Sequence, residues 1–318
     1  MRQRLLVVVN GAAGSADDEP VDAALTVLRS GADVEVAATA SPDELDEAVA
    51  GSDGRRIVVV GGDGSLHAVA GAMDRAGLLG DAPVGLIACG TGNDLARALG
   101  VPLDPEGGAR VVLEGTPRRL DVLREEDGLL VVNAVHAGVG ASAGRRAELF
   151  KDFLGPAAYP VGAVLAGASE SGWLLRVEVD GEIVTSGPGG WAADGETRVL
   201  MVGICNGPTV GGGTALAPGA QPGDGLLDVM VSVATGPAER LAFAAALRSG
   251  EHVDRDDVTV ARGRRCGSPE SRWASTPTAR CTRTSRSSSG AWTRESGRSP
   301  FRPDRSGFVG VTPTNPLR

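Results

Sequence analysis

The residues best suited to chemistry lie in Gly61-Gly62-Asp63-Gly64-Ser65, which follows the apolar run 57–60 and precedes a predicted helix over residues 66–76. Glycines let backbone N–H groups approach an anion closely, and the first turn of a helix offers unpaired donors and a positive dipole end. This pattern favours a phosphate-binding loop. Asp63 would then act through a metal ion or accept a proton, because a bare carboxylate repels phosphates. The alternative, a hairpin turn, is disfavoured by the helical segment that follows.

A second segment of the same design is Gly90-Thr91-Gly92-Asn93-Asp94, which lies between a predicted strand over 83–88 and a predicted helix over 95–99. Two such loops at successive strand ends are placed to line one crevice of an open α/β sheet. Asp94 could cap its helix, and Asn93 could hold a left-handed turn conformation. We expect those structural roles to coexist with ligand contact.

The elements around these loops predict an α/β domain with an open, mostly parallel sheet over residues 1–125. The run Leu5 to Val9 has the continuous apolar character of a strand buried on both faces, and it ends at a small-residue loop beginning with Asn10. Ser41-Pro42-Asp43-Glu44 carries an N-cap, a proline at the first helical position and a capping-box acid. Other predicted elements are a helix over 19–29 and strands over 33–38 and 118–123.

Residues 126–261 have a different texture, with strand-like runs separated by turn signals, which predicts a mainly antiparallel β domain. Asp180-Gly181 is expected at a hairpin tip. The predicted strands span 129–134, 174–179, 198–205 and 226–233. Helical pieces are expected over 159–169 and 237–247.

Composition narrows the class of protein. The formal net charge of −9 argues against nucleic acid as the main partner. No apolar run approaches the roughly 18 residues that span a bilayer, and the apolar run after Met1 is too short for a signal peptide. The four cysteines and three histidines are scattered, which argues against a zinc site and fits a reducing compartment. The sequence predicts a cytoplasmic protein, with peripheral association at a membrane surface left open.

Together with a third glycine-rich region, both loops resemble the diacylglycerol kinase catalytic-domain family of lipid kinases, which includes bacterial diacylglycerol kinases and sphingosine kinases. The resemblance covers roughly residues 4–261 and rests on 61–65, on 90–97 and on the later segments 206–218 and 224–228. It implies a nucleotide-binding α/β domain joined to a β-sandwich domain, with ATP between them. The implied activity is Mg²⁺-assisted phosphorylation of a lipid hydroxyl at a membrane surface, and a homodimer is compatible with the sequence.

The resemblance also assigns roles residue by residue. It places Asn10 near the nucleotide, the ATP phosphates at Gly61, Gly62, Gly64 and Ser65, and a second nucleotide loop at Thr91, Gly92 and Asn93. Asp63, Asp94 and Asp121 match acids that gather around magnesium, directly or through water. For Asp63 two roles stay open, metal ligand and base toward the lipid hydroxyl.

The tail over 262–318 is unlike the rest, because its 57 residues contain 12 arginines and 17 serines and threonines but only three of Val, Ile and Leu. Such a composition predicts disorder. A basic arm for anionic lipids is one interpretation. A slip of the reading frame near 262–265 is favoured, because the resemblance stops there and the late Asp-Gly-Glu of the family is missing. The alternatives to a lipid kinase are therefore a catalytically impaired nucleotide- or lipid-binding protein and an enzyme like NAD kinase.

Overall fold

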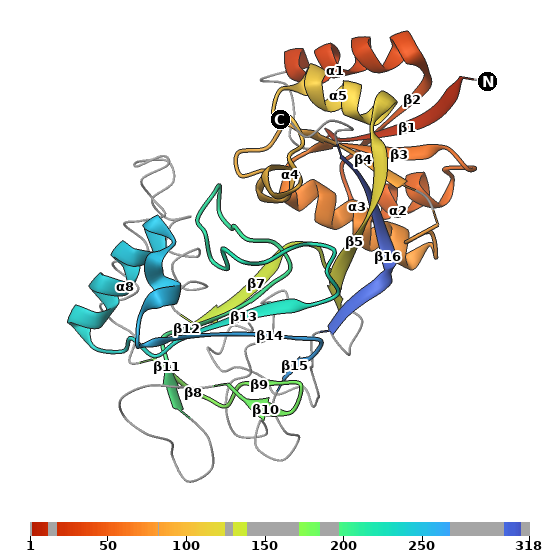
Figure 1. Cartoon of the computed structure of the whole chain (residues 1–318). Coiled ribbons are helices and arrows are strands. Elements are labelled where there is room, and N and C mark those ends of the chain that lie inside the picture. Colours follow the sequence, from red (N-terminus) through yellow and green to blue (C-terminus); the bar gives the residue numbers. More distant parts are fainter. Residues whose placement is uncertain are drawn as a thin grey trace, which may run out of the picture.

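The computed structural model describes residues 2–11, 18–81, 83–124, 130–138, 172–184, 197–267 and 302–312. The chain forms two domains that lie one above the other in Figure 1. The first domain is built on a seven-stranded sheet in the order β2-β1-β3-β4-β16-β5-β6. Its strands are β1 (Gln3–Asn10), β2 (Ala32–Thr39), β3 (Arg56–Gly61), β4 (Pro83–Ala88), β5 (Thr116–Arg124), β6 (Leu130–Val131) and β16 (Arg302–Thr312).

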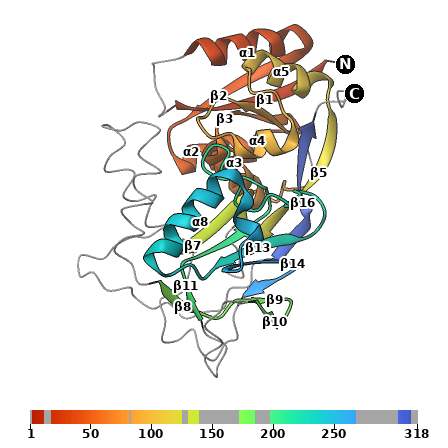
Figure 2. The same ribbon diagram turned by 60° about the vertical axis from the view of Figure 1, so that its left-hand side comes forward.

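Helices cover both faces of this sheet, as Figure 2 shows. One face carries α1 (Asp18–Gly31) and α5 (Pro105–Glu114), and the other carries α2 (Pro42–Ala50), α3 (Asp63–Arg75) and α4 (Asp94–Leu99). Alternate residues of β1 divide between the two cores: Leu5 and Val7 belong to one, and Leu6 and Val8 to the other. Strands β2, β1, β3 and β4 are all parallel. The predicted open α/β domain is confirmed.

Local signals account for two of these helices. Ser41 caps α2 by accepting the Glu44 N–H at 3.2 Å, and the Glu44 carboxylate accepts the Ala40 N–H at 2.8 Å, so the predicted capping box forms. Helix α5 was not predicted, although Asp104 followed by Pro105 is a start signal of the same kind. The Asp104 carboxylate accepts the Gly107 N–H at 2.7 Å.

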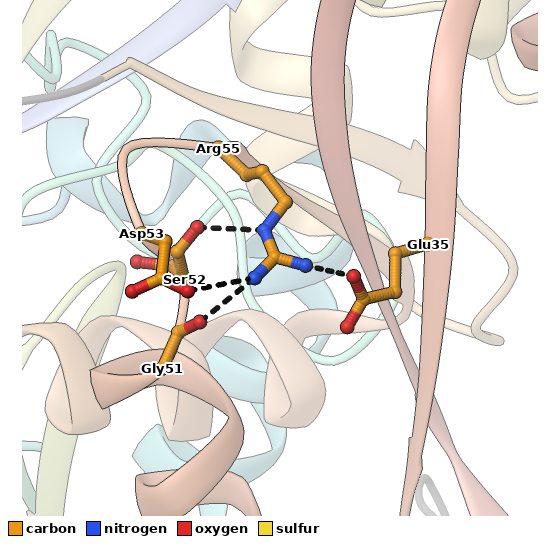
Figure 3. Close-up of polar contacts among 5 residues, drawn as sticks. All are labelled: Glu35, Gly51, Ser52, Asp53 and Arg55. Atoms are coloured by element: carbon orange, nitrogen blue, oxygen red, sulfur yellow. Dashed lines mark hydrogen bonds and ion pairs between the residues drawn. The ribbon is translucent and has the colours of Figure 1, made fainter.

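The turn between α2 and β3 is held by one side chain, shown in Figure 3. The Arg55 guanidinium donates to the carbonyl oxygens of Ser52 at 2.8 Å and Gly51 at 3.0 Å. It also pairs with the carboxylates of Asp53 and Glu35, the latter on β2. Arg55 therefore joins the turn to the neighbouring edge strand of the sheet.

The second domain contains an antiparallel sheet in the order β14-β13-β12-β7. Apolar side chains fill both faces of this sheet, and α8 covers one of them. The four strands are β7 (Ala134–Gly138), β12 (Met201–Cys205), β13 (Leu227–Ser232) and β14 (Val258–Gly263). Two smaller sheets contain β8 (Trp173–Leu175) with β11 (Thr197–Val199), and β10 (Glu182–Ile183) with β9 (Glu178–Val179) and β15 (Cys266–Gly267). Helix α8 (Pro237–Ser249) is followed by the 3₁₀ turn η3 (Glu251–Asp254).

These elements confirm the predicted antiparallel β domain. Asp180 and Gly181 both have positive φ, 52° and 87°, at the tip of the β9–β10 hairpin, as predicted. The helical piece expected over 159–169 lies outside the described residues. Within the part of the chain that the structure describes, no helix is long and apolar enough to cross a membrane.

The prediction of disorder for 262–318 is wrong for residues 262–267, which form the end of β14 and the strand β15, and for residues 302–312. Strand β16 returns to the first domain, where it pairs with β4 in parallel and with β5 in antiparallel orientation. The segment contains a short apolar stretch, Phe308, Val309 and Val311, that the average composition of the tail conceals. Its backbone hydrogen-bonds on both sides, which satisfies its polar groups. Residues 268–301 and 313–318 are not described.

Candidate active site

The two predicted loops lie against each other at the carboxyl ends of β3 and β4. Gly61 is paired with Ala88, and the Cys89 N–H donates to the Gly61 carbonyl oxygen at 3.1 Å. A Cβ atom built on Gly90 would lie 2.4 Å from the Gly62 Cα, so no side chain fits at this contact. The glycines therefore allow two backbones to touch, and the crevice expected from the sequence forms here.

Helix α3 begins inside the first loop and has no side-chain cap. Its N-cap residue is Gly62, and Asp63, Gly64 and Ser65 form its first turn. The N–H groups of this turn have no intrahelical partner, and they carry the positive end of the helix dipole. The Ser65 hydroxyl packs back against Gly61, 2.5 Å from where a Cβ would lie. This helix end has the donors that a phosphate group requires.

Helix α4 is capped from a distance. The Asp63 carboxylate accepts the Asp94 N–H at 3.0 Å and the Leu95 N–H at 3.2 Å. The expectation that Asp94 caps its own helix is wrong, because the first loop supplies the cap. Asn93 has the predicted left-handed conformation, with φ of 53°, and its side-chain amide bonds both the N–H and the carbonyl of Gly90. Asn93 thus fixes the shape of the second loop.

The Asp94 carboxylate points to the second domain. It accepts the Gly212 N–H at 2.9 Å and the Gly213 N–H at 2.8 Å, and Asp94 is only 3% exposed. These glycines belong to the segment 206–218 that carries the resemblance, which assigns them no role. Their place in a run of three glycines was the available signal.

Asp121, on β5, makes a separate contact between the domains. Its carboxylate accepts the Gly225 N–H at 2.6 Å, and its carbonyl oxygen accepts from the Asn206 side-chain amide at 2.8 Å. Asp121 is 2% exposed. The sequence did not assign Gly225 or Asn206 to this contact.

This geometry shows which carboxylates could hold a divalent cation. Among the described residues, no three His, Cys, Asp or Glu side chains form a group that could hold a metal ion, so Asp63, Asp94 and Asp121 do not gather as one cluster. Two of them do converge at Gly92, where an added Cβ would lie 2.9 Å from Asp63 Oδ2 and 3.3 Å from Asp94 Oδ2. Magnesium commonly uses one or two carboxylates together with water and substrate phosphates. Asp63 fits that requirement as one carboxylate, whereas both oxygens of Asp94 already accept the Gly212 and Gly213 N–H groups.

The remaining predicted residues lie at the same edge of the sheet. Asn10 ends β1, the parallel neighbour of β3, and Thr91 is exposed in the turn of the second loop. Cys89, directly before Gly90, is also exposed, and partial desolvation raises the pKa of its thiol. The structure thus brings together Asn10 and both glycine loops, whereas Asp121 lies in the domain junction.

Comparisons with known proteins agree with this arrangement. A family model described as the diacylglycerol kinase catalytic domain matches residues 4–124, and one described as the YegS C-terminal NAD kinase beta sandwich-like domain matches residues 133–275. A probable YegS-like lipid kinase of Pseudomonas aeruginosa is 34% identical over 239 residues, which cover 72% of each chain. Another from Xanthomonas campestris pv. campestris is 30% identical over 266 residues, covering 80% of this chain and 81% of the relative.

A crystal structure of a diacylglycerol kinase from Bacillus anthracis str. Sterne aligns with a TM-score of 0.68 at 17% identity, covering 98% of each chain. At that identity the alignment demonstrates a shared fold. The family models and the relatives together define a lipid kinase that consists of an α/β domain and an antiparallel β domain. The chain belongs to the family of YegS-like lipid kinases, whose first domain is a diacylglycerol kinase catalytic domain. The resemblance stated from the sequence is confirmed, and it extends beyond residue 261, because the second family model matches through residue 275.

Proposed function

We propose that the chain transfers the γ-phosphoryl group of ATP to a hydroxyl group of diacylglycerol or a related lipid, with assistance from Mg²⁺. The observation that carries the proposal is the uncapped N-terminus of α3, which lies against a second glycine loop in a chain of the lipid kinase family. Phosphoryl transfer depends mainly on positioning and on neutralising charge. Backbone N–H donors at a helix N-terminus contribute to both.

The first loop holds the phosphates in this proposal. Gly61, Gly62 and Gly64 leave the backbone accessible, and Ser65 adds a hydroxyl in the first turn of α3. Thr91 and Gly92 offer the second loop to the nucleotide, and Asn10 approaches it from the end of β1. The Asn93 amide is occupied with Gly90, so Asn93 contributes by holding the loop in shape.

Asp63 would hold Mg²⁺ directly or through water, at the place where its carboxylate approaches Gly92. Both oxygens of Asp94 already accept the N–H groups of Gly212 and Gly213, so Asp94 is not assigned to the ion. The bound ion would neutralise charge on the phosphates during transfer. Asp121 would contribute only through water, since one of its oxygens already accepts the Gly225 N–H. The second role for Asp63, base toward the acceptor hydroxyl, stays open. Both Asp63 oxygens accept N–H groups, which fixes the direction of the carboxylate.

The acceptor would be a lipid presented at a membrane surface, and we expect no nucleic acid partner. The likeness of the second domain to NAD kinase is a likeness of fold. NAD therefore serves as the control acceptor in an assay with labelled ATP and diacylglycerol in mixed micelles. Label in NAD but not in lipid would contradict the proposal.

Replacing Asp63 with asparagine tests the site itself. We expect Asp63→Asn to lower lipid phosphorylation by roughly 10²–10⁴-fold, with a loss of stability of about 1 kcal/mol from the weakened α4 cap. ATP binding is measured separately through the reaction of the exposed Cys89 thiol with a maleimide. We expect ATP to slow this reaction and adenosine to leave its rate unchanged. Cys205 and Cys266 are buried, and Cys281→Ser removes the fourth thiol.

Asp104→Asn is the matched control, because Asp104 is an exposed carboxylate that also caps a helix. It should cost similar stability and leave turnover unchanged. Turnover of Asp63→Asn near the wild-type rate would refute the assignment of Asp63. Absence of ATP protection at Cys89 in the wild-type chain would refute the nucleotide site.

A further inference from the structure

A third glycine loop, in the second domain, presents backbone donors to the first domain. Val210 and Thr214 exchange two backbone hydrogen bonds, of 2.8 and 3.0 Å, and close a tight loop. Gly211, Gly212 and Gly213 inside it all have positive φ, 63°, 89° and 109°. Only glycine adopts such a run at low cost. The loop turns the N–H groups of Gly212 and Gly213 outward together.

Asp94 receives both of these donors. Its carboxylate accepts the Gly212 and Gly213 N–H groups at 2.9 and 2.8 Å, although these residues are 118 and 119 positions away in sequence. The loops are also in direct backbone contact, since a Cβ on Gly212 would lie 3.7 Å from the Gly92 Cα. Hydrogen bonds to a buried charged group are among the stronger ones in proteins.

The contact continues into the first glycine loop. The Asp94 N–H donates to the Asp63 carboxylate at 3.0 Å, and Asp63 belongs to the first turn of α3. A single series of hydrogen bonds therefore runs from the second domain through Asp94 to the loop that we assign to the ATP phosphates. This series consists of hydrogen bonds to two carboxylates, Asp94 and Asp63.

Another polar link between the domains lies close to the covalent connection. Asp121 and Asn206 join β5 to the segment after β12, and the chain itself crosses between the domains at 132–134. That side of the junction is held by the backbone. The Asp94 link lies away from this crossing and joins the Gly211–Gly213 loop directly to the second nucleotide loop.

We infer that Asp94 is a positioning residue that docks the second domain on the nucleotide loops and so aligns the acceptor hydroxyl with the phosphate. This inference rests on the proposed function. It separates two properties: the first domain binds ATP whether or not the Asp94 link forms, whereas transfer to a lipid requires the link. A misplacement of about 1 Å between reacting groups can lower a rate by roughly 10²-fold.

The docking contact is measured without reference to activity, by amide hydrogen exchange in a peptide covering residues 208–216. We expect the Gly212 and Gly213 amides to be protected in the wild-type chain, to remain protected with MgATP, and to exchange roughly tenfold faster or more in Asp94→Asn and Asp94→Ala. Loss of protection in the wild-type chain on adding MgATP would overturn the inference, because Asp94 would then leave the glycines for the metal.

Kinetics then separates docking from metal binding. We expect Asp94→Asn to lower kcat for the lipid by roughly 10²-fold, with unchanged ATP protection of Cys89 and an unchanged Mg²⁺ concentration for half-maximal rate. A raised Mg²⁺ requirement with unaltered exchange of residues 208–216 would refute the positioning role. Asp104→Asn, on an exposed helix cap, should change neither measurement. If the wild-type chain phosphorylates no lipid, the proposed function fails, while the exchange data still decide whether Asp94 docks the domains.

Discussion

The two domains differ in how completely their buried polar groups are paired. In the described part of the first domain, one buried side-chain atom, Arg56 Nε, lacks a hydrogen-bond partner. The described part of the second domain contains several more: Oδ1 of Asn133 and Asn206, Oγ1 of Thr209, Nδ1 of His136 and His252, and Oδ2 of Asp228. A buried group without a partner lowers stability unless water or a ligand satisfies it.

The difference follows from the two architectures. A parallel sheet covered by helices on both faces needs only apolar side chains in its strands, and β1, β3 and β4 supply them. The antiparallel sheet of the second domain buries polar side chains beside the junction, where Asn206 contacts Asp121. Among the described residues, the first domain therefore leaves fewer buried polar groups unpaired than the second, although its buried Asp94 and Asp121 are paired by N–H groups of the second domain.

The largest test of this comparison concerns the missing late acid. If the reading frame is shifted by one nucleotide toward the 5′ end, the codons of Thr278, Ala279 and Arg280 can encode Asp-Gly-Glu. This requires that the codons of Pro277, Thr278 and Ala279 each end in G, and that the codon of Arg280 is AGA or AGG. We expect the coding DNA to contain this reading. A chain rebuilt in that frame should phosphorylate lipid faster by roughly 10²–10⁴-fold, as expected for a restored acid–base group.

Sequencing the coding DNA and assaying both chains side by side decides the matter. A shifted frame without Asp-Gly-Glu would refute the frame slip. If the rebuilt chain phosphorylates lipid no faster than the present one, catalysis by the first domain does not require that acid. ATP protection of Cys89 should be the same in both chains.

A smaller effect is expected from acid. Burial lowers the pKa values of His136 and His252 in the folded protein; for His252 the Leu216 carbonyl and Asp254 oppose this shift without reversing it. Above about pH 6.5 histidine is neutral in both folded and unfolded chains. Below about pH 6.5 these histidines bind protons in the unfolded chain but not in the folded second domain, so the stability of the fold decreases as the pH falls.

Tryptophan fluorescence is the probe, since no tryptophan lies before residue 173. We expect the urea midpoint of the fluorescence change to decrease between pH 7.5 and pH 5.5, and to decrease less in His252→Gln. His67→Gln changes an exposed histidine of the first domain and should leave the fluorescence midpoint's pH dependence as it is. An identical pH dependence in His252→Gln and the wild-type chain would contradict the assignment.

The meeting of the two loops was predictable from the sequence, because parallel strands end at one edge of a sheet, and Gly62 touching Gly90 confirms it. The partners of the acids were not predictable. Asp63 caps a helix 31 residues away, and Asp94 bonds glycines of another domain. Such pairings depend on how whole elements pack, and neither periodicity nor composition encodes them.

The predictions for the tail show the opposite error. Averaging over 262–318 gave disorder, yet residues 302–312 form a strand between β4 and β5. A gap between two strands supplies backbone partners that no property of the segment itself reveals. Composition therefore failed where the surrounding sheet, rather than the segment, determines the structure.

The smallest expected effect tests whether the hydrogen bonds and ion pairs of one side chain, Arg55, stabilise the first domain. Arg55 is 13% exposed and bonds two carbonyl oxygens besides its carboxylates, whereas the Arg75–Asp46 pair is exposed on both sides, 57% and 40%. We expect Arg55→Ala to lower the free energy of unfolding by about 1–2 kcal/mol and Arg75→Ala by about 0.2–1 kcal/mol, the range of surface ion pairs. Urea unfolding followed by far-UV circular dichroism measures both, and only the Arg75→Ala effect should shrink in 1 M salt. A loss in Arg75→Ala as large as that in Arg55→Ala would mean that side-chain charge, rather than the anchored turn, stabilises this domain.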